Sequence, residues 1–141
     1  MNFFKELEAF FEWMGETETP ISHSAALLWI YLLWRNNACA LPTLQGQWLW
    51  RVQFYVRPEL LERTLHTTYR NVARYRVELV NAGRLSYQNA RRGRSPGQYT
   101  MVPFAPNVGP EALTDLTGRP ATVYVVKDLP EADSPPVDNC P

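Results

Sequence analysis

Arginine is concentrated in one stretch of this 141-residue chain. Nine arginines lie within residues 57–94 against three acids, Glu59, Glu62 and Glu78, so the stretch carries a net charge of +6. Arginine is the side chain best suited to forked contacts with phosphate or guanine, and every base in the stretch is arginine. A basic stripe of this kind favours contact with nucleic acid over a merely solvated basic surface.

Part of this charge falls on a predicted helix at residues 67–82. Arg70 and Arg74 are four residues apart and therefore share one helix face. Threonines at the start of the helix can bond a phosphate through their hydroxyl and backbone N–H groups. The residues of this helix that we expect to contact DNA are Thr67, Thr68, Tyr69, Arg70, Asn71 and Arg74.

A second part of the charge, Arg91, Arg92 and Arg94, lies in the segment NARRGRSPGQY, residues 89–99. Its glycines and proline are typical of a loop. The flanking segments RLSYQNA and QYTMVPF alternate between apolar and polar residues, which predicts a β-hairpin with the basic segment as its tip. We expect these three arginines to contact phosphates.

The remaining elements must position these groups. A first helix is predicted from one apolar face, and a second, apolar nearly all round, begins after Ser22 or Ser24. It is followed by a turn region made of Asn36, Asn37 and residues 40–46. One aromatic strand is predicted at 48–56, and Pro58 opens a short helix at 58–65. Gly83 is placed to end the long basic helix. The residues assigned to the first apolar face are Phe3, Phe4, Leu7, Phe10, Phe11 and Met14.

This order of helix, helix, strand, short helix, long basic helix and hairpin predicts a winged helix-turn-helix. The expected class is α+β and mainly helical, with an N-terminal helix extension and a C-terminal hairpin wing. One helix of such a domain lies in the major groove of double-stranded DNA while the wing reaches the flanking backbone. Residues 1–104 form the expected DNA-binding domain. Residues 105–141 are a Pro-rich acidic tail whose candidate extra strand is 121–129.

Three segments also resemble the N-terminal winged-helix domain of DnaD-like and phage replisome-organiser proteins. They are FFEWMGETETPISHSAALLWIYLLWRNN, TTYRNVARYRVELVNAGRLSY and GQYTMVPF. The resemblance covers about residues 3–104 and implies DNA binding in replication initiation of a phage, plasmid or mobile element, as a dimer or higher oligomer. The matching residues are Trp29, Leu32, Asn36, Asn37, Arg76, Glu78, Leu79, Gly83 and Tyr99.

Two other functions remain open from the sequence. The acidic start of the chain, with a net charge of −4 over residues 1–20, also suits a protein-interaction or oligomerisation module of a replication complex. A transcriptional regulator would use the same fold equally well.

Arg76 lies where a winged helix usually carries an apolar residue. We expect it to pair internally, with Glu62 or near Glu78, because a buried arginine is normally paired. Tyr75 and Tyr87 are expected in the core or sheet.

The tryptophans have a similar structural interpretation. Trp13, Trp29 and Trp34, at helical spacing, are expected in the core or on an oligomer surface. Trp48 and Trp50 would indicate an interface if they are exposed.

The sequence contains little that indicates an enzymatic or a membrane function. His23, His66 and Cys39 lack a recognisable orienting group or oxyanion loop, so no enzyme is expected, and no cofactor or metal site is predicted. No apolar run is long enough to span a membrane, and the start does not resemble a signal peptide. Cys39 and Cys140 match no metal or redox spacing, so we expect a cytoplasmic protein with Cys39 as a buried thiol.

Overall fold

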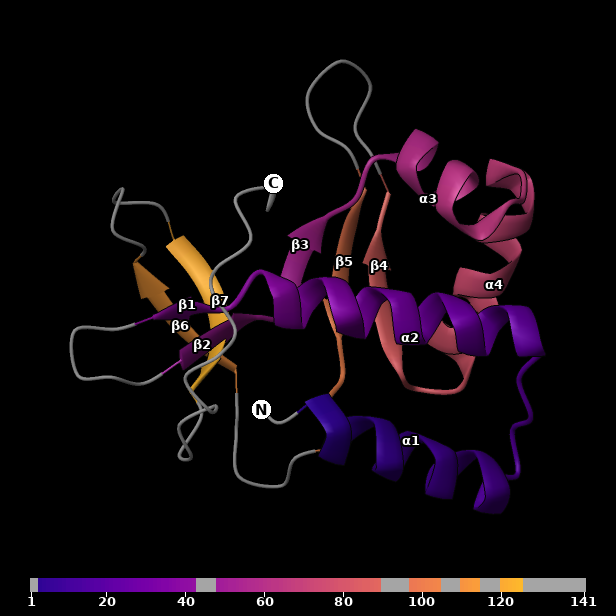
Figure 1. Cartoon of the computed structure of the whole chain (residues 1–141), viewed down its shortest axis with the longest axis horizontal. Coiled ribbons are helices and arrows are strands. Elements are labelled where there is room, and N and C mark those ends of the chain that lie inside the picture. Colours follow the sequence, from indigo (N-terminus) through magenta and orange to yellow (C-terminus); the bar gives the residue numbers. More distant parts are fainter. Residues whose placement is uncertain (1–2, 43–47, 90–96, 105–109, 115–119, 126–141) are drawn as a thin grey trace.

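The residues that the structure describes form four helices and two small antiparallel sheets, which confirms the α+β class (Figure 1). The computed structural model describes residues 3–42, 48–89, 97–104, 110–114 and 120–125. The helices are α1 (Phe3–Glu16), α2 (His23–Ala38), α3 (Pro58–Leu65) and α4 (Tyr69–Asn81). The strands are β1 (Leu41–Pro42), β2 (Trp48–Arg51), β3 (Gln53–Tyr55), β4 (Leu85–Gln88), β5 (Gln98–Met101), β6 (Pro110–Thr114) and β7 (Pro120–Val125).

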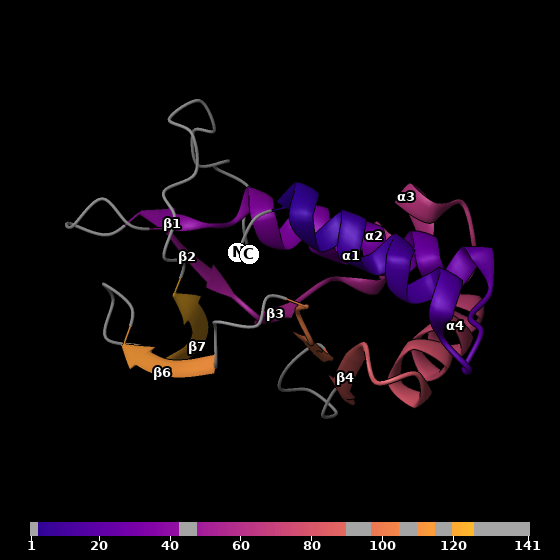
Figure 2. The same cartoon turned by 90° about the horizontal axis from the view of Figure 1, so that it is seen from below.

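Helix α2 is the central core element. It begins after Ser22, whose Oγ accepts a hydrogen bond from the Ala25 N–H at 3.1 Å and so caps the helix. Its core side chains Leu28, Trp29 and Leu32 are fully buried. The ring of Phe10 on α1 stacks on Trp29 with centroids 4.0 Å apart, and this contact holds α1 alongside α2 (Figures 1 and 2).

The predicted hairpin is present as β4 and β5, which form a three-stranded sheet with β3 in the order β3-β5-β4. Tyr87 lies opposite Tyr99, and Leu85 opposite Met101. The turn from α4 into β4 passes through Gly83, whose φ of +76° favours glycine. The tip with Arg91, Arg92 and Arg94 lies outside the described residues.

The single strand expected at 48–56 is wrong, because the chain bends at Val52 and each half joins a different sheet. Strand β2 pairs with β7, whereas β3 pairs with β5. The buried Val52 fixes the bend, since its carbonyl accepts the Met101 N–H at 2.9 Å. The second sheet, β1-β2-β7-β6, lies at the end of the molecule away from α3 and α4 (Figure 2). Strand β7 overlaps the candidate strand 121–129, whereas β1 falls in the expected turn region and β6 was not predicted.

The apolar face expected on α1 is also wrong in part. Phe4 is 77% and Phe11 57% exposed, whereas Glu6 is only 2% exposed. The helix turns Glu6 inward because its carboxylate accepts the Phe104 N–H at 2.8 Å. Phe4 and Phe11, which belong to the predicted apolar face, are therefore exposed to solvent.

The expectation of a buried thiol at Cys39 is wrong as well. Cys39 is half-exposed and is disulfide-bonded rather than free. None of the helices within the described ranges has the length and apolarity needed to cross a membrane.

Candidate nucleic-acid interface

The long basic helix α4 starts two residues later than the sequence predicts. Helix α3 ends at Leu65, the cap residue His66 turns the chain with a φ of +50°, and Thr67 and Thr68 lie in the connection before α4. Thr68 caps α4, because its Oγ1 accepts the Asn71 N–H at 3.3 Å. Both threonines therefore precede the helix, and the Thr68 hydroxyl already has a partner within the chain.

One face of α4 points to solvent and carries charge in its first half. We call Arg70, Arg74, Val77 and Asn81 the α4 outer face, since all four are exposed and follow each other at helical spacing. Val77 is 57% exposed. The opposite face, with Val72 and Leu79, is fully buried.

The side chain of Arg74 is held by its neighbours in the chain. Its Nη2 donates to Asn71 Oδ1 at 3.0 Å, and Asn71 Nδ2 donates in turn to Thr67 Oγ1 at 3.1 Å. Asn71 is half-buried and its amide is engaged at both ends. Among the predicted contact residues, Asn71 therefore positions Arg74, while Arg70 and Arg74 present exposed cationic groups.

The buried face of α4 carries a third arginine, Arg76, which is only 7% exposed. Its Nη1 donates to the hydroxyls of Tyr99 at 3.1 Å and Tyr69 at 3.5 Å, and its guanidinium lies 3.7 Å from the ring centre of Tyr87. We call Arg76 and these three tyrosines the Arg76 cluster. The internal pairing of Arg76 is confirmed, but its partners are tyrosines rather than the expected Glu62 or a group near Glu78.

The cluster keeps its arginine charged. Burial disfavours the guanidinium charge, but the hydrogen bonds to Tyr99 and Tyr69 outweigh it and raise the pKa of Arg76 above its ordinary value. The pKa of Tyr87 is raised to about 12, mainly by burial and to a smaller extent by a hydrogen bond with Tyr69. At neutral pH a cation is therefore surrounded by neutral phenols, whose hydroxyls and ring faces replace water around it.

The Arg76 cluster joins α4 to both strands of the hairpin. Tyr69 and Arg76 come from α4, Tyr87 from β4 and Tyr99 from β5, and the rings of Tyr87 and Tyr99 lie 4.9 Å apart. Gly97 is required beside them, because a Cβ there would collide with the ring of Tyr87. The base of the hairpin is thus fixed relative to the arginines on the α4 outer face.

A half-buried arginine, Arg84, lies in the turn after α4. Its guanidinium stacks 4.1 Å from the ring centre of Phe104 and 5.7 Å from that of Trp13. Burial lowers the pKa of Arg84, and the nearby Glu6 carboxylate offsets only part of this effect. This group attaches α1 to the segment that follows β5.

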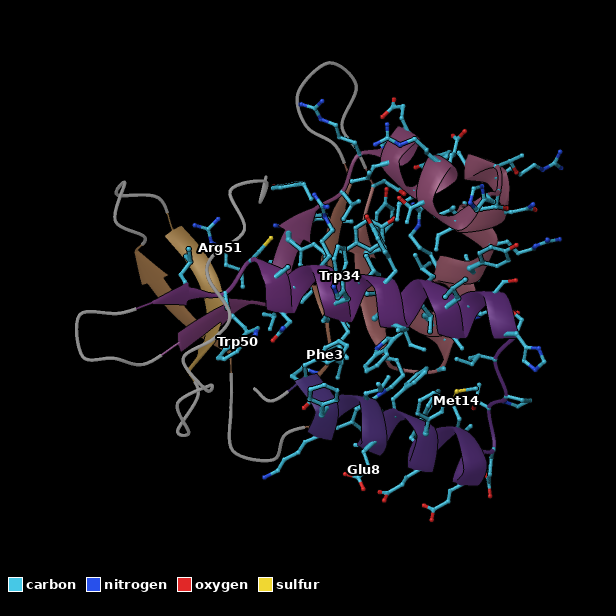
Figure 3. All side chains as sticks on the ribbon, viewed as in Figure 1. Phe3, Glu8, Met14, Trp34, Trp50 and Arg51 are labelled. Carbon is cyan, nitrogen blue, oxygen red and sulfur yellow. The ribbon has the colours of Figure 1, made fainter. Side chains whose placement is uncertain are left out.

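The remaining aromatic residues are mainly structural. Tyr75 is half-buried, and hydrogen bonds with Ser24 and Thr67 lower its pKa. Trp50 is 1% exposed and donates to Asn37 Oδ1 at 3.3 Å, so it belongs to the core rather than to an interface. Trp34, by contrast, is 54% exposed on α2 (Figure 3).

Comparison with protein-family models, with curated proteins and with solved structures produced no match. The described part of the chain contains no group of three or more metal-ligating side chains. The function must therefore be argued from the residues of this chain alone. Three features can serve a polyanionic ligand: the α4 outer face, its hydrogen-bonded Arg74, and a hairpin base attached to the same helix.

Proposed function

We propose that this chain is a winged-helix protein that binds double-stranded DNA, in replication initiation of a phage, plasmid or mobile element. The order α2, β3, α3, α4, β4, β5 and the sheet order β3-β5-β4 are those expected of a winged helix. The observation that carries the proposal is the division of α4, with exposed arginines on one face and attachment to the hairpin through Arg76 on the other.

The proposed complex places α4 in the major groove. The groove is about 12 Å wide and admits one helix, so Arg70 and Arg74 would meet guanine edges or phosphates there. Asn71 holds Arg74 outward, which reduces the entropy that this long side chain would lose on binding. The hairpin would then lie over the neighbouring backbone, where Arg91, Arg92 and Arg94 would contact phosphates.

Fluorescence anisotropy with a short mixed-sequence duplex at increasing salt tests the α4 assignment. Replacing Arg70 and Arg74 together by alanine should weaken binding about tenfold or more and reduce the salt slope by about two, since each lost phosphate contact releases one counterion fewer. A single Arg74→Ala change should weaken binding more than Lys5→Ala, which removes the same charge from an exposed position on α1. Absence of binding by the wild-type chain at low salt would contradict the proposal.

The wing assignment has its own test. Replacing Arg91, Arg92 and Arg94 together by alanine should weaken DNA binding and leave the oligomeric state unchanged. An unaltered affinity and salt slope would show that the hairpin tip does not contact phosphate, while leaving the α4 assignment standing.

A second function is favoured by one observation. Phe4 and Phe11 on α1 and Leu27 and Trp34 on α2 are all more than half exposed, and the two residues of each pair lie two turns apart on one side of their helix. Such surfaces suit a module that self-associates as a dimer or higher oligomer or docks on a replication protein. A transcriptional regulator would need the same DNA-contacting groups, and replication genes beside the coding sequence would favour initiation over regulation.

A further inference from the structure

Helix α1 presents an acidic and aromatic surface away from the core. We call Phe4, Glu8, Phe11 and Glu12 the α1 outer face, since all four are exposed. Phe4 is 77% and Phe11 57% exposed, and the two rings lie two helical turns apart on the same side. Glu8 points away from α2 (Figure 3). The opposite side of α1 packs through Phe10 onto Trp29.

The α4 outer face has the matching composition with the opposite charge. Glu8 and Glu12 on α1 are four residues apart, as are Arg70 and Arg74 on α4. The two acids of one face can therefore lie against the two arginines of the other, with the exposed apolar side chains of each face beside these charge pairs. Each face combines charge with apolar area, as a small protein–protein interface requires.

We propose that the α1 outer face of one copy of this chain docks on the α4 outer face of a second copy and thereby excludes DNA from α4. The self-association stands on the two faces themselves. The exclusion of DNA rests on the proposed function, because it requires that Arg70 and Arg74 also contact DNA.

The contact forms between copies rather than within one. Helices α1 and α4 both pack against α2, so their outer faces both point away from it and do not meet inside the molecule (Figure 1). A contact between two different faces is heterologous, and it continues from copy to copy unless the rotation closes a ring. The expected assembly is therefore a concentration-dependent series of short oligomers rather than one stable dimer.

The size of the faces makes the association weak. Helix α1 has 14 residues and is about 21 Å long, so one helix-on-helix contact buries an area at the low end for specific complexes. Much of its affinity comes from charge, so salt should weaken it. A weak contact of this kind can be displaced by a polyanion that binds the same arginines, which suits reversible inhibition.

Sedimentation velocity of the full chain at graded concentration tests the two faces. The double variants Glu8→Lys/Glu12→Lys and Arg70→Glu/Arg74→Glu should each associate at least about tenfold more weakly than wild type, because each places like charges opposite one another. An equimolar mixture of the two should recover association, since each variant again finds an oppositely charged face. The control Glu18→Lys/Glu59→Lys makes the same change in net charge as Glu8→Lys/Glu12→Lys, at exposed positions on neither face, and should behave as wild type.

Two results would overturn the docking: wild-type-like association of either face variant, or a mixture that stays as dissociated as its components. Circular dichroism of each variant separates these results from misfolding. A short duplex added to wild type should dissociate the oligomers, and Glu8→Lys/Glu12→Lys should bind that duplex at least as tightly as wild type. If neither wild type nor either face variant binds the duplex, while the mixture of the two face variants still recovers association, the proposed function fails and the docking stands.

Discussion

Arg74 and Arg76 are two residues apart on one helix and have opposite environments. Arg74 is exposed and held by Asn71 at 3.0 Å, whereas Arg76 is 7% exposed among three tyrosines. The helical period alone separates them, because positions two apart fall on nearly opposite sides. The positive charge of α4 therefore has two separate roles: Arg74 is available to a ligand, and Arg76 fixes the hairpin that would meet that ligand.

The largest effect should come from removing the buried member of this pair. Arg76→Ala leaves the buried Tyr99 hydroxyl without its partner and opens space beside Tyr87, so we expect it to lower the free energy of unfolding by about 3 kcal/mol. Arg74→Ala should change it by no more than about 0.5 kcal/mol, as is usual at exposed positions. Urea denaturation of both variants measures the contrast, and equal effects would contradict it.

Arg76→Met separates the two contributions. Methionine retains much of the apolar volume but donates no hydrogen bond, and it removes the cost of burying a charge. If hydrogen bonding dominates, the methionine variant should be nearly as unstable as the alanine variant. Stability close to wild type would show that Arg76 acts mainly by filling space between α4 and the hairpin.

The half-buried Arg84 extends this comparison, because it has a carboxylate nearby where Arg76 has phenols. Glu6→Ala removes the charge beside Arg84 and the acceptor of the Phe104 N–H, so we expect a loss of about 2 kcal/mol of stability. Glu6→Gln retains an acceptor and should cost less. The control Glu16→Ala, at an exposed position on the same helix, should stay within about 0.5 kcal/mol of wild type by the same denaturation measurement.

Much of the fold follows from local patterns in the sequence. Proline at N1 located α3, Gly83 marked the end of α4, and alternation located β4 and β5, because each of these signals acts through neighbouring residues. The bend at Val52 and the second sheet did not follow. They depend on pairing with β7, which is 69 or more residues away from β2 and leaves no local signal except an imperfect alternation.

The candidate site was predicted to a similar extent. Arg70 and Arg74 were placed on an exposed face from their spacing, but the tyrosine partners of Arg76 were not foreseen. The sequence does indicate that Arg76 is buried, since it lies at helical spacing from Val72 and Leu79, on the same face of α4. The partners were harder to foresee because Tyr87 and Tyr99 meet Arg76 only after the hairpin folds back on α4. The inward turn of Glu6 likewise depends on a distant residue, Phe104.

The smallest expected effect concerns the phenols around Arg76 at alkaline pH. The pKa of Tyr87 is raised to about 12 in the folded chain from an ordinary value of 10.0, so between these values the unfolded chain releases a proton that the folded chain keeps. The folded state then binds more protons, and its stability falls as pH rises through this window, whereas the contribution is fully present below pH 10. Tyr69, whose pKa is lowered, acts in the opposite direction, but its effect on stability lies below pH 10 and therefore outside this window. Allowing for solvent screening of the half-buried ring, the stability difference between wild type and Tyr87→Phe should shrink by about 1 kcal/mol across the window.

Urea denaturation at several alkaline pH values measures this difference in stability. The matched control is Tyr55→Phe, which changes an exposed ring outside the cluster. A difference that stays constant with pH would mean that the Tyr87 hydroxyl is not held neutral by its burial beside Arg76.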